Sequence, residues 1–218
     1  MDPDPAEIRV VGCLLEKQRT TPDAYPLSLN ALRLACNQAT NRDPVVEYDE
    51  ATVVAALRRL AQRGWTRLAS GAGSRARKYR HLLNDALGLE DAELSLLAVL
   101  MLRGAQTPGE LKQRADRLHR FADLGTVQET LDRLIERGHV ARLDRRPGQK
   151  EERYAQLLGG EAQSSPRQSA PETADQSAEA RPETNLAGAG DADRLDRLEH
   201  ELSELREQVR QLREALGD

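Results

Sequence analysis

The sequence predicts a mainly helical α+β fold with small β-hairpins, built as two tandem copies of one unit. Its composition, with 31% charged and 3% aromatic side chains in 218 residues, suits small helical domains better than one large core. Residues 53–83 are repeated as residues 127–158. In each copy, apolar side chains recur every three or four residues through three segments, and a short strand, a glycine-containing turn and a second strand follow.

The duplication is clearest around the third helix and the hairpin of each copy. Four positions match at one offset, and the pairs are Val53 and Val127, Leu57 and Leu131, Leu60 and Leu134, and Gly64 and Gly138. The segment "KYRHLL" matches "RYAQLL" one residue later, so the extra residue falls in the turn. Upstream, "EIRVVGCLLEK" matches "ELSLLAVLMLR", and Thr21-Pro22 matches Thr107-Pro108 with a longer insert in the first copy.

The helix ends carry capping signals. Asp4 is the predicted N-cap of the first helix, with Pro5 at the first helical position and the Glu7 side chain reaching back. The segment 107–110 repeats this pattern in the second copy. We expect the glycines that follow the two third helices to end them in the left-handed conformation.

Three helices followed by a two-stranded hairpin are typical of the winged helix-turn-helix, so we predict such domains at residues 1–84 and 85–158. In that architecture the third helix enters the DNA major groove, and the hairpin, or wing, contacts the backbone or the minor groove.

The C-terminal part has a different composition. Residues 159–190 contain few large apolar side chains and are rich in Ala, Ser, Glu, Pro and Gly, which predicts a disordered linker. Residues 191–218 carry a heptad stripe that predicts a coiled-coil helix and self-association as a parallel dimer. The alternative is a helix that folds back onto its own domains. The predicted dimerisation residues are Leu195, Leu198, Leu202, Leu205, Val209, Leu212 and Leu216.

Four strings resemble a known family: "RVVGCLLEKQRTTPDAYPLSLNALRLACNQATNRDPV", "SGAGSRARKY", "LRGAQTPGELKQRADRLHRF" and "RRPGQKEERY". They are similar to the YceH-like family of uncharacterised bacterial tandem winged-helix proteins, from residue 7 to about residue 158. The resemblance implies the tandem winged-helix fold and brings no catalytic residues. The family pattern usually has a lysine where this chain has Ala39. The turn at residues 37–42 therefore carries one cation fewer in this chain than in the family pattern.

The first wing is the leading candidate for nucleic-acid contact. Arg75, Arg77 and Lys78 lie in its predicted strand and turn, with Arg75 and Arg77 on one side and Tyr79 able to point into the domain. Such a wing suits phosphate groups or a narrow minor groove. The alternative is an exposed hairpin whose charges only keep it soluble.

Two further sets of candidate nucleic-acid contacts are ambiguous. In the second hairpin, Asp144, Glu151 and Glu152 are interleaved with the candidates Arg145, Arg146 and Lys150, which favours self-paired surface charge. The other set precedes the third helix of the first copy, where amide side chains could bond adenine edges or only form a helix C-cap and turn. These residues are Asn37, Gln38, Thr40, Asn41 and Arg42.

The charge distribution gives mixed support to nucleic-acid binding. Residues 1–83 have a formal charge of +4, residues 84–158 of −1 and residues 159–218 of −7, which together give −4. Glu47, Asp49 and Glu50 lie at the start of the third helix, where they would repel phosphate unless they serve as caps.

The remaining motifs exclude several functions. Cys13 and Cys36 lie in apolar helical patterns and are expected to be buried reduced thiols, which fits a cytoplasmic protein. We find no membrane span, no secretory signal in "MDPDPAE", no histidine pair at metal-ligand spacing and no catalytic motif. The sequence therefore predicts a cytoplasmic DNA-binding, regulatory protein without catalytic activity, metal or cofactor. The alternative is a protein-interaction scaffold.

Overall fold

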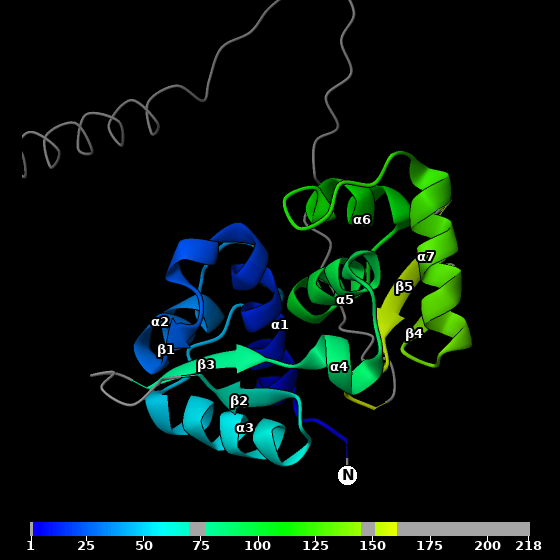
Figure 1. Ribbon diagram of the computed structural model, residues 1–218. Helices are drawn as coiled ribbons and strands as arrows, with labels where there is room; N and C mark the ends of the chain where they lie inside the picture. Colours follow the sequence, from blue (N-terminus) through cyan, green and yellow to red (C-terminus); the bar gives the residue numbers. More distant parts are fainter. Residues whose placement is uncertain (1, 70–76, 145–150, 161–218) are drawn as a thin grey trace, which may run out of the picture. The chain divides into compact units, whose positions relative to one another are not determined.

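The first copy opens with the predicted capping box. In the computed structural model, which describes residues 2–69, 77–144 and 151–160 (Figure 1), helix α1 spans Pro5–Thr20. The Asp4 carboxylate accepts a hydrogen bond from the Glu7 N–H (2.8 Å), and the Glu7 carboxylate accepts one from the Asp4 N–H (3.0 Å). N–H groups at the start of a helix have no carbonyl acceptor within the helix. The two side chains supply these acceptors, so the capping box fixes where α1 begins.

The other elements of the first copy follow in the order helix, helix, hairpin, with two short additions before the second helix. They are η1 (Pro22–Ala24), β1 (Leu27–Ser28), α2 (Leu29–Cys36), α3 (Glu50–Gln62), β2 (Thr66–Leu68) and β3 (Lys78–His81). The short helix α4 (Leu83–Leu87) then leads into the second copy.

The hairpin of the first copy belongs to a three-stranded antiparallel sheet in the order β1-β3-β2. Tyr79 on β3 lies opposite Leu27 on one side and Leu68 on the other. Strand β1 was not predicted, because two residues are too few to show an alternating pattern.

The second copy contains α5 (Asp91–Arg103), α6 (Pro108–Ala115), α7 (Leu124–Glu136), β4 (Val140–Leu143) and β5 (Arg153–Gln156). Strands β4 and β5 form a two-stranded antiparallel sheet. A single bridge from Gln106 to Tyr154 stands where β1 pairs with β3 in the first copy.

The structure corrects one part of the internal alignment. Thr107 is the N-cap of α6, as predicted, but Thr21 precedes only η1. The cap of α2 is Ser28, whose hydroxyl accepts a hydrogen bond from the Ala31 N–H (3.3 Å). The counterpart of Thr107 is therefore Ser28. The first copy carries its insertions both before α2 and between α2 and α3.

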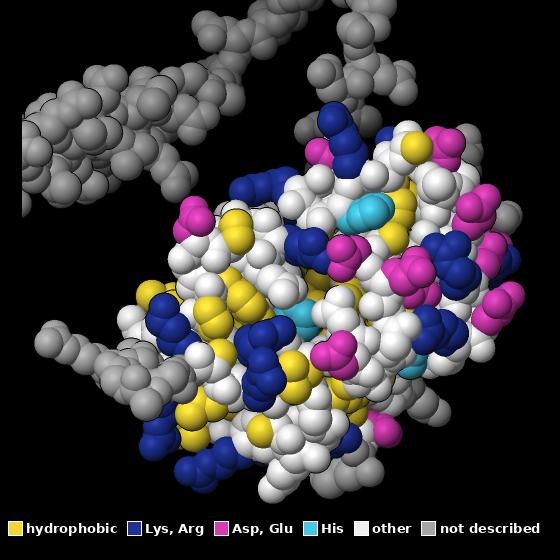
Figure 2. Space-filling view, viewed as in Figure 1, with side chains coloured by type: hydrophobic (Ala, Val, Ile, Leu, Met, Phe, Trp, Pro, Cys, Tyr) yellow, Lys and Arg dark blue, Asp and Glu magenta, His cyan; other side chains and the backbone are white. Residues whose placement is uncertain are grey.

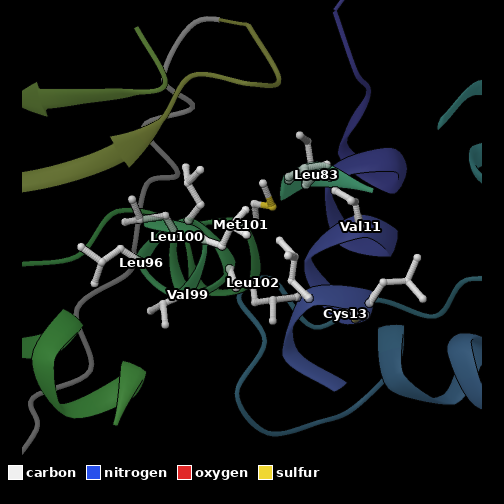
Figure 3. Packing of buried hydrophobic residues seen from close by; sticks show 14 of the residues in the cluster. Val11, Cys13, Leu83, Leu96, Val99, Leu100, Met101 and Leu102 are labelled. Carbon is white, nitrogen blue, oxygen red and sulfur yellow. The ribbon is translucent and has the colours of Figure 1, made fainter. Parts of the chain in front are cut away.

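Helices α1 and α5, which open the two copies, pack against each other in one continuous core (Figure 3). Gly12 lies at their closest approach, since a Cβ there would lie 3.1 Å from Cβ of Met101 and from Cδ2 of Leu102. The two copies belong to one compact unit, which ends at Arg167.

The expected fold class is confirmed in its coarse form. The described residues form a mixed α+β structure with seven α-helices and two small antiparallel sheets. Gly64 (φ 74°) and Gly138 (φ 72°) adopt the predicted left-handed conformation, and Cys13 and Cys36 are buried free thiols. The predicted linker from residue 161 onward and the leucine stripe at residues 191–218 lie outside the described residues.

Candidate nucleic-acid interface

The hairpin of the first copy presents two of its three predicted cations to solvent. Lys78 begins β3, Arg77 precedes it, and both side chains are exposed; Arg75 lies outside the described residues. Arg77 and Tyr79, two residues apart, line the same groove, and Tyr79 also packs against the core, as its predicted inward orientation implies.

Helix α3 presents a face of small and polar side chains opposite its buried one. Val53, Ala56, Leu57 and Leu60 are buried against the core. Ala51, Arg58 and Gln62 are exposed on the outward face, and Ala55 between them is partly exposed. Small residues on this face allow a ligand to approach the helix backbone closely.

The acidic residues at the start of α3 have different roles. Asp49 is its N-cap, and its carboxylate accepts a hydrogen bond from the Thr52 N–H (2.8 Å). Bonds from the side chain and the backbone of Thr52 hold the pKa of Asp49 below its ordinary value. Glu47 and Glu50 are exposed and form no ion pair with another described residue.

A groove of about 820 Å³ lies between α3, the start of α2 and the hairpin. Val54, Leu57 and Tyr79 contribute apolar surface to it, and Leu68 does so while 52% exposed. Three arginines line it: Arg58 from α3, Arg67 from β2 and Arg77. Within the described ranges none of the three guanidinium groups forms an ion pair. In Figure 2, Lys and Arg side chains surround apolar ones over the lower left, where Figure 1 places α3 and β3.

Several polar side chains in the segment before α3, in contrast, form hydrogen bonds within the protein. The Asn37 side chain donates to the Tyr48 carbonyl (2.8 Å) and accepts from the Tyr48 N–H (2.9 Å). Asn41 adopts φ 62°, and its side-chain oxygen accepts from Arg103. Thr40 is exposed. The turn interpretation of Asn37 and Asn41 therefore describes their contacts better than base recognition does.

Arg42 is the clearest departure from the predicted set of contacts. Its side chain is 0% exposed, and its guanidinium pairs with Glu16 on α1 through bonds of 2.6 and 3.1 Å. It also donates to the Ala35 carbonyl (3.0 Å) and to the Gln38 side chain (2.7 Å). A buried cation with these partners has no donor to offer a phosphate, so Arg42 and Gln38 are left out of the interface proposed below.

The second copy fills the corresponding surface with ion pairs. By the internal alignment, Asp132 stands at the position of Arg58, Arg142 at that of Leu68, and Glu152 at that of Arg77. Arg142 lies 3.7 Å from Asp132 and 3.4 Å from Glu152, which is the self-pairing expected for this hairpin. Arg145, Arg146 and Lys150 lie outside the described residues.

Sequence reasoning missed Arg58 and Arg67. Arg58 could have been predicted, because the apolar periodicity of α3 shows which face is buried, and Arg58 lies on the opposite face. Nothing local distinguished Arg67, since a three-residue strand gives too short a pattern.

The structure also bears on membranes and metals. Among the helices of the described ranges, none is long and apolar enough to cross a membrane. The same part of the chain contains no group of three or more His, Cys, Asp or Glu side chains that could hold a metal ion.

The described residues define a mixed α+β protein with a duplicated helical unit and an arginine-lined groove beside α3. The chain belongs to the family described as "Protein of unknown function, DUF480", whose model matches residues 4–149. This confirms the predicted resemblance to an uncharacterised bacterial family.

Two relatives show how far the similarity extends. A "UPF0502 protein" from Pelobacter propionicus is 50% identical over 214 residues, which cover 97% of this chain and 94% of the relative. A "UPF0502 protein" from Geobacter metallireducens is 48% identical over 199 residues, which cover 90% of this chain and 86% of the relative.

Proposed function

We propose that this protein is a cytoplasmic, non-enzymatic DNA-binding regulator whose two copies are tandem winged helix-turn-helix domains. The first copy makes the DNA contact: α3 enters the major groove, and the β2–β3 hairpin lies along the backbone as the wing. The elements that this arrangement needs occur in the required order, three helices and then a hairpin.

The observation that carries the proposal is the set of exposed cations shared by α3 and the hairpin. Arg58, Arg67, Arg77 and Lys78 are exposed, and none of them has a carboxylate partner in the described part of the chain. Unpaired guanidinium and ammonium groups keep their full charge available for phosphate, whereas paired groups would first have to break an internal contact.

The side chains on the outward face of α3 are suited to the major groove of DNA. Ala51 and Ala55 are small enough for close approach, and the exposed Gln62 carries the amide that can bond adenine in the major groove. Because Asp49 is occupied as a cap, the acidic groups that remain at this end of the helix are Glu47 and Glu50.

Fluorescence anisotropy with a mixed-sequence duplex tests the proposal. Four phosphate contacts predict that the logarithm of affinity falls with the logarithm of salt concentration with a slope of about −3.6. The titration should start near ~50 mM salt, where electrostatic binding is strong. No binding at that concentration, or binding without salt dependence, would refute the proposal.

A second function, that of a protein-interaction scaffold, is favoured by one feature of the second copy. The outward side of α7 carries Glu129, Asp132 and Glu136 beside the exposed Leu124, a surface unsuited to phosphate. A pull-down from nuclease-treated lysate separates the two functions. A stoichiometric protein that depends on Leu124 supports the scaffold, and recovery of nucleic acid alone contradicts it.

A further inference from the structure

The groove beside α3 has a feature that phosphate contact does not use. Its floor combines Leu29 from α2, Val54 and Ala61 from α3, and Leu68 and Tyr79 from the sheet. Leu68 is one of the few large apolar side chains in the described residues that stay about half exposed. A volume of about 820 Å³ with mostly apolar walls and a few polar groups falls in the range of pockets that hold drug-sized organic molecules.

The rim of the groove selects the charge of such a molecule. Arg58, Arg67 and Arg77 carry three positive charges, against the one carboxylate of Glu50. None of the three arginines is neutralised by an ion pair with a described residue. An apolar body with one anionic group would cover the floor and also receive charge-assisted hydrogen bonds from the rim.

Among the described residues, the corresponding surface of the second copy has neither the apolar floor nor the unpaired cations of this groove. There Arg142 replaces the exposed Leu68, and the carboxylates of Asp132 and Glu152 lie within ion-pair distance of it. The guanidinium of Arg142 also lies over the Tyr154 ring, 5.8 Å from its centroid. The same fold position is thus filled and self-neutralised in one copy and left apolar and positively charged in the other.

We propose that the groove between α3 and the hairpin of the first copy binds a small amphipathic organic anion, such as a medium-chain carboxylate. The apolar chain lies along Val54, Leu68 and Tyr79, and the carboxylate pairs with the arginine rim. If the proposed DNA binding holds, on which this consequence rests, the anion competes with DNA, because both use Arg58 and Arg77.

Ligand binding is tested on the full chain in the absence of DNA. The probe is 8-anilinonaphthalene-1-sulfonate, an aromatic anion whose fluorescence rises in apolar surroundings. Octanoate should displace it at a concentration at least tenfold lower than acetate, which lacks the apolar chain, or octanol, which lacks the charge. Equal displacement by octanol would show general apolar adhesion and overturn the proposal.

Two variants locate the site, each compared with a matched control. Ala61→Trp fills the floor and leaves every charge in place, and Arg77→Gln removes one rim cation. Each should weaken probe binding about tenfold, whereas Arg117→Gln, at an exposed arginine of the second copy, should leave it unchanged. Probe affinity unchanged in both groove variants would overturn the proposal. Circular dichroism establishes that the variants are folded, and the comparison of octanoate with octanol in the unmodified protein does not depend on them.

Competition is tested separately by adding octanoate to the DNA complex. Release of DNA at the concentration that displaces the probe supports the shared site. Unchanged DNA affinity with the groove occupied would overturn the competition alone. Failure of the protein to bind DNA would refute the proposed function and leave the probe experiments decisive for the groove.

Discussion

Arg58 and Asp132 occupy the same position of the duplicated unit with opposite charge. Arg58 is exposed on α3 without an ion-pair partner among the described residues. Asp132 on α7 accepts a hydrogen bond from the Gln128 side chain (3.0 Å) and lies 3.7 Å from Arg142. Arg77 and Glu152 differ in the same way. The two copies therefore share a scaffold and differ in the chemistry of one surface, which provides an internal comparison for testing function.

The first prediction transfers the charges of the second copy to the first. The double variant Arg58→Asp and Arg77→Glu should lower DNA affinity at least tenfold and reduce the salt slope by about 2, because each lost phosphate contact removes about one unit. The control variant Arg117→Asp with Arg120→Glu makes the same change in net charge at exposed sites of the second copy. Anisotropy titrations at several salt concentrations measure both. An equal effect in the control would show that net charge alone, and not this surface, determines affinity.

The second prediction separates the structural role of Arg42 from a DNA contact. Arg42→Met removes the nearer of the two cations that pair with Glu16, a mostly buried carboxylate, and leaves it with Lys17 at 3.7 Å. The loss should cost about 3 kcal/mol of unfolding free energy. DNA affinity measured well below the unfolding temperature should change less than about twofold.

Urea unfolding and anisotropy give the two readouts for Arg42. The double variant Glu16→Gln with Arg42→Met should recover part of the lost stability, because no unpaired charge then remains. A large loss of DNA affinity in folded Arg42→Met protein would return this residue to the interface.

These expectations show which parts of the molecule follow from local sequence. The caps at Asp4 and Thr107 and the ends at Gly64 and Gly138 were predictable, because a cap or a left-handed glycine depends on residues within one turn. The hairpins were predictable because glycine-containing turns separate short alternating segments.

The roles of Arg42 and Asn37 could not be read in this way. Arg42 pairs with Glu16, 26 residues earlier, and Asn37 with Tyr48, 11 residues later. A polar turn that is held by distant partners has the same local pattern as one that is open to a ligand. The groove likewise needs α2, α3 and the hairpin together, so its arginine rim appears only once the chain is folded.

The third prediction concerns acid stability. Burial, followed by the charges of Arg80 and Arg19, lowers the pKa of His81 to about 4. Its ring Nδ1 accepts a hydrogen bond from the Leu83 N–H (3.3 Å), and Nε2 lies 2.6 Å from the Gln18 side-chain oxygen. The folded state therefore holds the neutral ring, whereas the unfolded chain titrates near pH 6.5. This contribution to stability is complete above pH 6.5 and is lost as the pH falls towards 4.

Urea unfolding at pH 7 and pH 4.5 measures this loss. The unmodified protein should lose about 2 kcal/mol more between the two values than His81→Gln does, because the variant has no ring to protonate. His119→Gln, which changes a partly exposed histidine beside Phe121, is the control and should follow the unmodified protein. Parallel behaviour of all three proteins would rule out His81 as the responsible group.

The last prediction concerns residues 191–218, whose structure is not described. Their apolar residues alternate at spacings of three and four, and one isolated helix cannot bury such a stripe. With Leu195 at an a position, Arg194 faces Glu199 and Glu201 faces Arg206 across a parallel pair, so the charges favour that orientation.

Because about three heptads are close to the lower limit for stable association, the dimer should be weak, with a dissociation constant in the micromolar range. Sedimentation equilibrium at about 50 µM should therefore find a dimer for the full chain and a monomer after truncation at Gly190. Leu202→Glu should abolish association, whereas Ser203→Glu, which adds the same charge outside the stripe, should not.

A dimer joined in this way would gain avidity on DNA where the linker lets both first copies bind at the same time. Truncation should therefore weaken binding to a duplex with two sites more than binding to a duplex with a single site. A full-length monomer, or a truncated protein that still dimerises, would show that this segment is not the dimerisation element.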